Sequence, residues 1–150
     1  EGTTLSEGRG TDWPFELFGA PWLDAEALMG KLRNEELPGL EFAVTDFVPS
    51  RSKHAGLRCQ GLQVRVTDRN SLQSVAAMLT VIRHIRAIHG DVDLWHRDEV
   101  SGQHFFDMLL CDEKIRLAIE EGQDLHSVVS RYDTAAELWA RERSPFLSYQ

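Results

Sequence analysis

The stretch that decides the fold class is GLQVRVTDRNSLQSVAAMLTVIRHIRAIHG, residues 61–90. Its first part alternates apolar with polar residues, as a strand with one solvated face does. Its second part has apolar residues three or four apart, which predicts a helix over 72–88 with cap candidates at 68–71 and a stop at Gly90. The apolar residues of the strand are Leu62, Val64 and Val66, and those of the helix are Leu72, Val75, Leu79, Ile82, Ile85 and Ile88.

The flanking sequence predicts one more strand and more helices. Residues 42–47 alternate like a strand that Pro49 ends, and Asp24 is placed to cap a helix over 25–36. Further helices are predicted from about 105, over 113–121, and from 125 to the stop at Pro145, the last with the stripe Leu125, Val128, Val129, Tyr132, Ala136 and Trp139. Because the helices mostly follow two adjacent strands, we predict one α+β domain, a small sheet with a strand pair packed against several helices.

Length and charge exclude several classes of protein. A chain of 150 residues fits one domain, which buries enough surface to fold without stabilising disulfides or metal ions. The net charge of −8 argues against a general binder of nucleic acid or anionic membranes, since both need a basic face. No apolar run approaches the ~20 residues of a membrane span. The start on Glu-Gly-Thr, without Met, indicates a processed protein or an excised fragment, so the lack of a signal peptide does not indicate a compartment.

The cysteine and histidine content predicts neither a disulfide framework nor a metal site. Cys59 and Cys111 are the two cysteines, and we expect both to be buried free thiols. His54 and Cys59 are the best pair of metal ligands, but zinc needs about four. We therefore expect no metal and no cofactor.

The glycine-rich opening of the chain is the first candidate functional loop. Arg9 stands between Gly8 and Gly10, where the backbone can approach a ligand and a guanidinium can bind a carboxylate or phosphate. No dinucleotide or phosphate-loop motif is present. The alternative is that Arg9 pairs with Asp12 or Glu16 and only ties the loop down.

Residues 50–61 form the second candidate loop, which is too polar for a regular element and too long for a tight hairpin. Lys53 can fix an anion and His54 can shuttle a proton, although a solvated loop is the simpler interpretation. Carboxylates near the first loop, on Glu1, Glu7 and Glu16, suit glycoside chemistry, but their spacing selects no pair. The aromatic residues Trp13, Phe15 and Trp22 are able to stack on a sugar, but we expect them in the core.

Taken together, three segments of the chain resemble the NamZ family of exo-β-N-acetylmuramidases. They are EGTTLSEGRGTDWPFELFGAPWL (1–23), SKHAGLRCQGLQVRVTD (52–68) and ERSPFLSYQ (142–150). The run EGT-x-LS-x-GRGT-x-x-PFE-x-x-GAPW is long and unusual, and the resemblance covers essentially the whole chain. Family members are longer, with a Rossmann-like N-terminal domain, an auxiliary C-terminal domain and an active site in the cleft between them.

The resemblance implies a domain division and a function. Residues 1–22 would be the crossover from a missing N-terminal catalytic domain, and residues 23–150 the C-terminal auxiliary domain. The whole enzyme would release N-acetylmuramic acid from non-reducing ends of peptidoglycan, and this chain alone would be inactive. The implied partners are peptidoglycan fragments or muramoyl sugars and the N-terminal domain of the same chain. The implied substrate favours a periplasmic, cell-surface or secreted location.

The resemblance also suggests roles for individual residues. Arg9 would bind the lactyl carboxylate of muramic acid, with Gly10 and Thr11 beside it and Lys53 assisting. His54 would be a polar contact in the cleft. The candidate catalytic carboxylate of this chain is Glu1. The alternatives are a non-catalytic module that binds cell-wall sugar, or a homodimerisation domain that uses the last helix.

Overall fold

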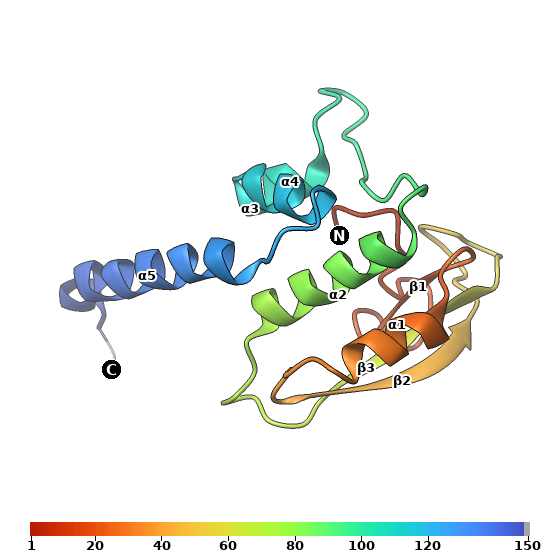
Figure 1. The fold of residues 1–150 in the computed structure, drawn as a ribbon, viewed down its shortest axis with the longest axis horizontal. Coiled ribbons are helices and arrows are strands. Elements are labelled where there is room, and N and C mark those ends of the chain that lie inside the picture. The colour runs from red at the N-terminus through yellow and green to blue at the C-terminus, as the bar shows by residue number, and fades with distance from the viewer. Residues whose placement is uncertain (149–150) are drawn as a thin grey trace.

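The computed structural model describes residues 1–148, and the side chains of residues 126–128, 131 and 133 lie outside that description. In chain order the elements are β1 (Leu17–Ala20), α1 (Ala25–Leu32), β2 (Leu40–Phe47), β3 (Cys59–Val66), α2 (Ser74–Ile88), α3 (Phe105–Leu110), α4 (Lys114–Glu120), α5 (His126–Arg143) and a 3₁₀ turn, η1 (Ser144–Phe146). The predicted α+β class, a small sheet packed against helices, is confirmed (Figure 1).

The sheet is antiparallel, with the strand order β1-β3-β2. The predicted strand pair is confirmed, and β2 pairs with β3 along its whole length from Leu40↔Val66 to Phe47↔Cys59. Strand β3 starts at Cys59, earlier than the alternation of the sequence indicated, because Gly61 interrupts the apolar pattern there. The predicted loop over 50–61 is therefore shorter, and "the second loop" below means residues 48–58.

Strand β1 lies within the opening segment, where we predicted only a loop. Its four residues are all buried, so they show no alternation between apolar and polar. Gly19 pairs with Gly61 of β3, and a Cβ atom on Gly19 would lie 2.2 Å from the Gln60 carbonyl oxygen. This close approach of two strands requires glycine, and the same residue hides the strand from a search for periodicity.

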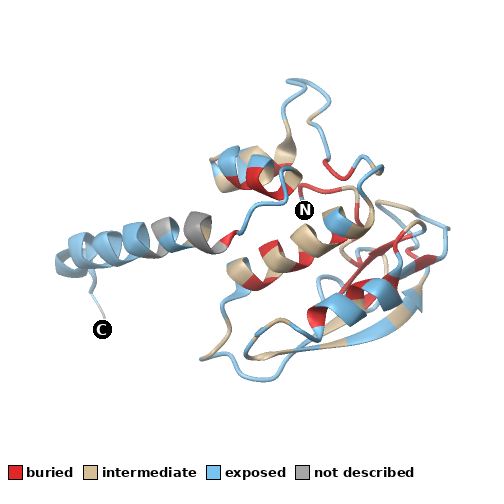
Figure 2. Cartoon of the chain, in the orientation of Figure 1, coloured by how far each residue is buried: buried red, intermediate tan, exposed pale blue. Residues whose placement is uncertain are grey.

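The core lies between the sheet and the helices on one of its faces. Figure 1 shows α1 and α2 on that face, with α3 and α4 on the far side of α2. Figure 2 shows buried positions concentrated where these layers meet. The largest fully buried side chains include Leu23, Leu28, Leu62, Val81, Ile85, Leu94 and Ile119. The predicted stripe of α2 is buried at Leu79 and Ile85, but Val75 is 61% exposed because it lies in the first turn, beyond the edge of the core.

The predicted helix ends are confirmed in part. The Asp24 carboxylate accepts a hydrogen bond from the Ala27 N–H at 2.9 Å, which is the predicted cap of α1. That helix ends at Leu32 rather than at 36. The predicted caps of α2 are wrong, because Asp68 instead binds Asn70 and Ser71 in a turn ahead of the helix, and Gln73 occupies the N-cap without a side-chain bond.

The three C-terminal helices form as predicted, but α5 is not buried along its stripe. Leu125 is buried, whereas Tyr132 is 37% and Trp139 is 61% exposed, and the side chain of Val128 lies outside the described residues. Figure 1 shows α5 extending away from the rest of the domain, and Figure 2 shows most of its described surface as exposed. Among the described residues, no helix is both long enough and apolar enough to cross a membrane.

The two cysteines differ in environment. Cys59 is buried and free as expected, and burial raises the pKa of its thiol. Cys111 is free but exposed, so that expectation is wrong. It follows the last turn of the short surface helix α3 in the left-handed conformation, with φ 54°, where little of the chain covers it.

Two valines of α2 test this account of the core. We expect Val81→Ala to lower the free energy of unfolding by about 2–3 kcal/mol, because the side chain is fully buried and two methyl groups are lost. The same substitution at the exposed Val75 is expected to stay within about 0.5 kcal/mol of wild type. Urea unfolding of both variants is the measurement, and equal losses would contradict the packing described.

Candidate functional site

The opening segment is held against the sheet and the loop after α2. Ser6 forms a bridge with Gly19 of β1 through two backbone hydrogen bonds, of 2.8 and 3.0 Å. Thr3 bridges Trp95, and the Thr4 N–H donates to the Leu94 carbonyl oxygen at 2.8 Å. The segment over residues 1–16, "the first loop" below, is therefore an ordered part of the domain.

The two candidate loops meet through side chains and backbone. The Lys53 ammonium lies 3.0 Å from a carboxylate oxygen of Glu7. The His54 Nε2 atom donates to the Thr4 carbonyl oxygen at 2.8 Å, and the donor role follows because a carbonyl only accepts. The Ser50 N–H and hydroxyl both donate to the Gly10 carbonyl oxygen. The structure thus places Arg9, Gly10, Thr11, Lys53 and His54 on one pair of loops.

Gly10 makes its close approach to the second loop. Its φ is +85°, and a Cβ atom there would lie 2.6 Å from the Arg51 nitrogen. Glycine is therefore required at position 10 because the second loop packs against it. The sequence alone instead predicts that this glycine lets a ligand approach the backbone. The Thr11 hydroxyl is also used within its own loop, because it donates to the Gly8 carbonyl oxygen at 2.6 Å and accepts from the Trp13 N–H.

Arg9 pairs with Glu1, and not with Asp12 or Glu16 as the simpler interpretation of the sequence had it. Its guanidinium also lies over the Phe15 ring, 4.9 Å from the ring centroid, which holds the side chain in place. The Arg9 side chain is 45% exposed, and an exposed ion pair contributes about 0–1 kcal/mol. An external anion is thus able to compete with Glu1 for this guanidinium at low cost.

Glu7 is the residue of this site that sequence reasoning considered but did not select. Its side chain is only 14% exposed, and one of its carboxylate oxygens is buried without a hydrogen-bond partner among the described residues. Burial raises the pKa of Glu7, but the hydrogen bond and charge of Lys53 and a backbone hydrogen bond outweigh it, so the net pKa is lowered. The sequence feature that could have selected Glu7 as a site residue is its position directly before Gly8-Arg9-Gly10.

Backbone strain is concentrated in the same two loops. Among the described non-glycine residues, φ is positive at Phe15, Ser52, His54 and Cys111. Three of these four lie in the first or second loop. Left-handed conformations of such residues persist only where the surrounding structure enforces them, and they cluster at binding sites. The strain therefore supports a functional role for the loop pair.

The aromatic residues of the opening segment are not all in the core. Trp13 is 53% exposed and Phe15 is 62% exposed, so the expectation of core packing is wrong for both. Both belong to the part of the first loop between Ser6 and β1, and Trp13 lines surface grooves with Gln63 of β3 rather than packing between the sheet and the helices. Trp22 is partly buried against the core, with its ring edge-on to His89 at 5.3 Å, so the expectation is confirmed there.

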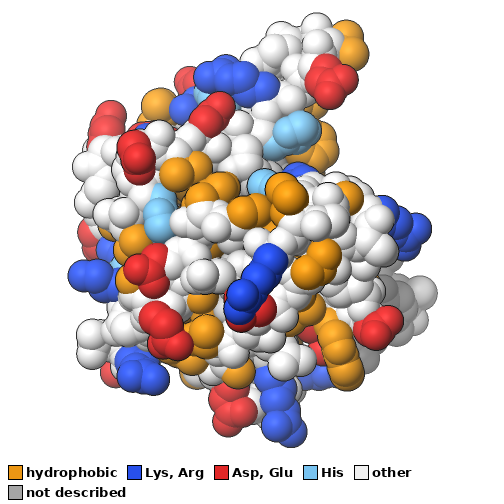
Figure 3. Space-filling model, turned by 90° about the vertical axis from the view of Figure 1, so that its right-hand side faces the viewer, with side chains coloured by type: hydrophobic (Ala, Val, Ile, Leu, Met, Phe, Trp, Pro, Cys, Tyr) orange, Lys and Arg blue, Asp and Glu red, His pale blue; other side chains and the backbone are white. Residues whose placement is uncertain are grey.

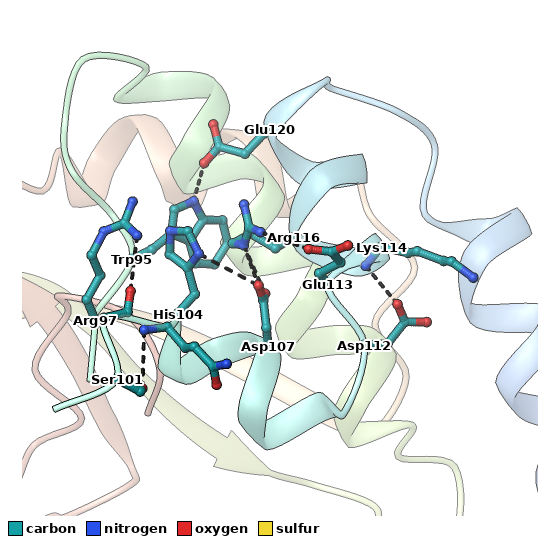
Figure 4. Close-up of polar contacts among 12 residues, drawn as sticks. Trp95, Arg97, Ser101, His104, Asp107, Asp112, Glu113, Lys114, Arg116 and Glu120 are labelled. Carbon is teal, nitrogen blue, oxygen red and sulfur yellow. Dashed lines mark hydrogen bonds and ion pairs between the residues drawn. The ribbon is translucent and has the colours of Figure 1, made fainter. Parts of the chain in front are cut away.

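A second polar cluster joins α3 to α4 (Figure 4). Asp107 accepts from the Arg116 Nε atom at 2.9 Å and faces His104 Nδ1 at 3.7 Å. Burial and the nearby arginines lower the pKa of His104, so its ring is neutral at about pH 7. These groups pair with each other and hold the two helices together. Among the described residues, no group of three histidine, cysteine or carboxylate side chains is placed to hold a metal ion.

The fold and the loop pair define a class, an α+β domain that carries a charged, strained site built by two loops on one sheet. The chain matches the family described as "Exo-beta-N-acetylmuramidase NamZ, C-terminal" over residues 1–149, and it belongs to that family. It is 37% identical over 150 residues to the peptidoglycan beta-N-acetylmuramidase NamZ of Bacillus subtilis (strain 168). That alignment covers 99% of this chain and 35% of the relative, so the chain spans about a third of the relative's length.

Two solved structures share the fold. Both are crystal structures of DUF1343 family proteins from Bacteroides fragilis NCTC 9343. The first has a TM-score of 0.84 at 24% identity, covering 98% of this chain and 38% of that chain. The second has a TM-score of 0.65 at 20% identity, covering 99% and 37%. They support the architecture described above and no more.

The Glu7–Lys53 pair predicts a pH dependence of stability. Because the pKa of Glu7 is lowered by folding, its stabilisation is present at neutral pH and is lost as pH falls through and below the ordinary glutamate range. We expect Glu7→Gln to be less stable than wild type at about pH 7, with a difference that shrinks toward about pH 3. Unfolding free energies measured across this range, with the exposed Glu36→Gln as control, check it. A constant difference would contradict the assignment.

Proposed function

We propose that this chain is the C-terminal auxiliary domain of an exo-acting peptidoglycan hexosaminidase that releases N-acetylmuramic acid from non-reducing ends. The supporting observation is the meeting of the first and second loops in a domain that matches the NamZ C-terminal family over nearly its whole length. The B. subtilis relative is named for this activity, and this chain corresponds to about a third of it. The whole reaction therefore belongs to a longer protein.

In this proposal the loop pair contributes the cationic side of the substrate cleft. Arg9 binds the lactyl carboxylate, because it is exposed and its present partner, Glu1, is exchangeable. Lys53 assists from the second loop, where its pairing with Glu7 holds the two loops together, and His54, Gly10 and Thr11 shape the loops around Arg9. Glycoside hydrolysis uses two carboxyl groups, and Glu1 is the candidate from this chain. The remaining carboxyl group lies on the N-terminal part of the enzyme.

The proposed domain division keeps residues 1–22 as the crossover between the two parts. Ser6 and β1 of this segment pair with the sheet, so the crossover also forms one wall of the auxiliary domain. The peptidoglycan substrate and the N-terminal catalytic domain are the proposed partners. A homodimer through α5 is the alternative, which the exposed side chains of Leu138 and Trp139 support.

The division of labour is tested by two proteins on one substrate. We expect the full-length gene product that contains this chain to cleave a chromogenic β-N-acetylmuramide, and the 150-residue chain alone to be inactive. The reason is that most of the catalytic groups lie outside this chain. Release of the chromophore is the measurement. Failure of the full-length protein to cleave would contradict the proposed activity.

The role of Arg9 is tested by substrate preference in the full-length protein. We expect Arg9→Ala to reduce kcat/KM by about tenfold or more for lactyl-bearing sugars, since a charge-assisted hydrogen bond is lost, and to change lactyl-free sugars little. The exposed Arg69→Ala serves as the matched control. If the variant processes both sugars in the wild-type ratio, Arg9 does not bind the lactyl group.

A further inference from the structure

The face of the sheet opposite α1 and α2 is open. Strand residues alternate between faces, and Leu62 is fully buried on the helix side. Its neighbour Gln63 therefore projects from the other face, together with its partner Ala43, which is exposed. The same face carries the cross-strand pair Glu41↔Arg65 and Thr45. The predicted solvated side of β3 is thus a mixed polar surface that is exposed or half-buried at these positions of β2 and β3, whereas at β1 Leu17, the partner of Gln63, is buried.

Trp13 lies over this face between two grooves. Each groove encloses about 450 Å³, and Trp13 and Gln63 line both of them. One groove runs past Thr45 to Gly10 and Thr11 of the first loop. The other runs past Ala43 toward Arg65. Trp13 therefore lies between two neighbouring grooves, together called "the track" below, and one of them reaches Gly10 and Thr11 of the proposed lactyl-binding loop.

The chemistry of this track fits a sugar better than a protein. An exposed indole presents a large flat apolar surface, and the C–H face of a pyranose ring is its natural partner. Amide, hydroxyl and carboxylate groups line the two grooves together with apolar side chains, and such a mixture of an apolar surface with a few polar groups is typical of small-ligand sites. Figure 3, which shows the domain from its right-hand side in Figure 1, shows acidic and basic side chains interspersed among small apolar patches.

The charge of the track selects a neutral sugar. Three carboxylates line it beside the indole, on Asp12, Glu16 and Glu41. Arg65 is the cation that lines the groove toward Glu41. A fourth carboxylate, on Asp46, is already paired with Arg58. An anionic sugar would therefore meet net negative charge on the track. On the loop pair the charges of Arg9 and Lys53 are balanced by Glu1 and Glu7, and the exposed Arg9–Glu1 pair is the one that an anion can exchange into.

We propose that Trp13 and Gln63 form a platform for a neutral β-linked hexosamine, adjacent to the terminal sugar whose lactyl group the loop pair holds. The platform rests on the proposed function, because it takes the next unit of the same glycan. The sugar ring stacks on the indole, and the Gln63 amide both donates to and accepts from its polar groups. The chain would then recognise an anionic unit and a neutral unit side by side.

The test is binding of chitotriose, a neutral β-linked N-acetylglucosamine trimer, to the 150-residue chain. We expect chitotriose to perturb the NMR signal of the Trp13 indole N–H, and Trp13→Ala to weaken its binding by at least about tenfold, as loss of one stacking ring does. The matched control is Trp139→Ala, which removes an indole on α5 that is 61% exposed, against 53% for Trp13, and is expected to leave affinity within about twofold. Gln63→Ala, which keeps the indole, is expected to weaken binding less than Trp13→Ala.

A second ligand separates this inference from the proposed function. N-acetylmuramic acid is titrated into the same chain and into Arg9→Ala. If muramic acid binds in an Arg9-dependent manner while chitotriose is not bound, or is bound equally by wild type and Trp13→Ala, the platform is overturned and the proposed function stands. If chitotriose requires Trp13 while Arg9→Ala binds muramic acid like wild type, the platform stands and the lactyl assignment fails.

Discussion

The loop pair depends on one row of residues that crosses the sheet. Ser6, Gly19, Gly61 and Thr45 lie side by side, each bonded or paired to the next. The two glycines in the middle allow the strands to approach so closely that a Cβ atom on Gly61 would lie 2.0 Å from the Phe18 carbonyl oxygen. This row fixes the first loop against β1 and so brings Thr4 and Glu7 to the second loop. A larger residue at either glycine would push β1 and β3 apart and so shift the first loop relative to the second.

The two ion pairs of the site have different physical characters. Glu7 and Lys53 are largely buried, and their pairing lowers the pKa of Glu7 despite the cost of removing its charge from water. Glu1 and Arg9 are both substantially exposed, so their mutual attraction is screened. The inner pair therefore joins the loops, and the outer pair leaves a guanidinium exposed to solvent. The proposed function assigns this guanidinium to a substrate anion. Burial therefore distinguishes the Glu7–Lys53 pair, which stabilises the loops, from the Glu1–Arg9 pair, which solvent can reach.

The two faces of the sheet also differ, because one contributes to the core and the other lies at the surface. One face packs Leu62 and its neighbours against α1 and α2, and this face supplies the core. The other face carries Gln63 and Thr45 beneath the exposed Trp13 and contributes little to the core. Because the side chains of a strand alternate, residues next to each other in sequence serve packing and surface chemistry in turn. The surface to which we assign sugar binding is therefore built from residues that the core does not use.

The sequence by itself determined the α+β class, the pair β2–β3, the cap on Asp24 and the family, since these rest on local periodicity, hydrogen-bonding side chains and a long motif. It also marked both candidate loops, through glycine and cations between regular elements. The strand β1, the burial of Glu7 and the exposure of Trp13 and Cys111 were decided only by the tertiary structure. The reason is that a short buried strand has no alternation, and that burial depends on which distant segment lies against a residue. Lys53 is 46 positions from Glu7, and only the folded sheet brings the two together.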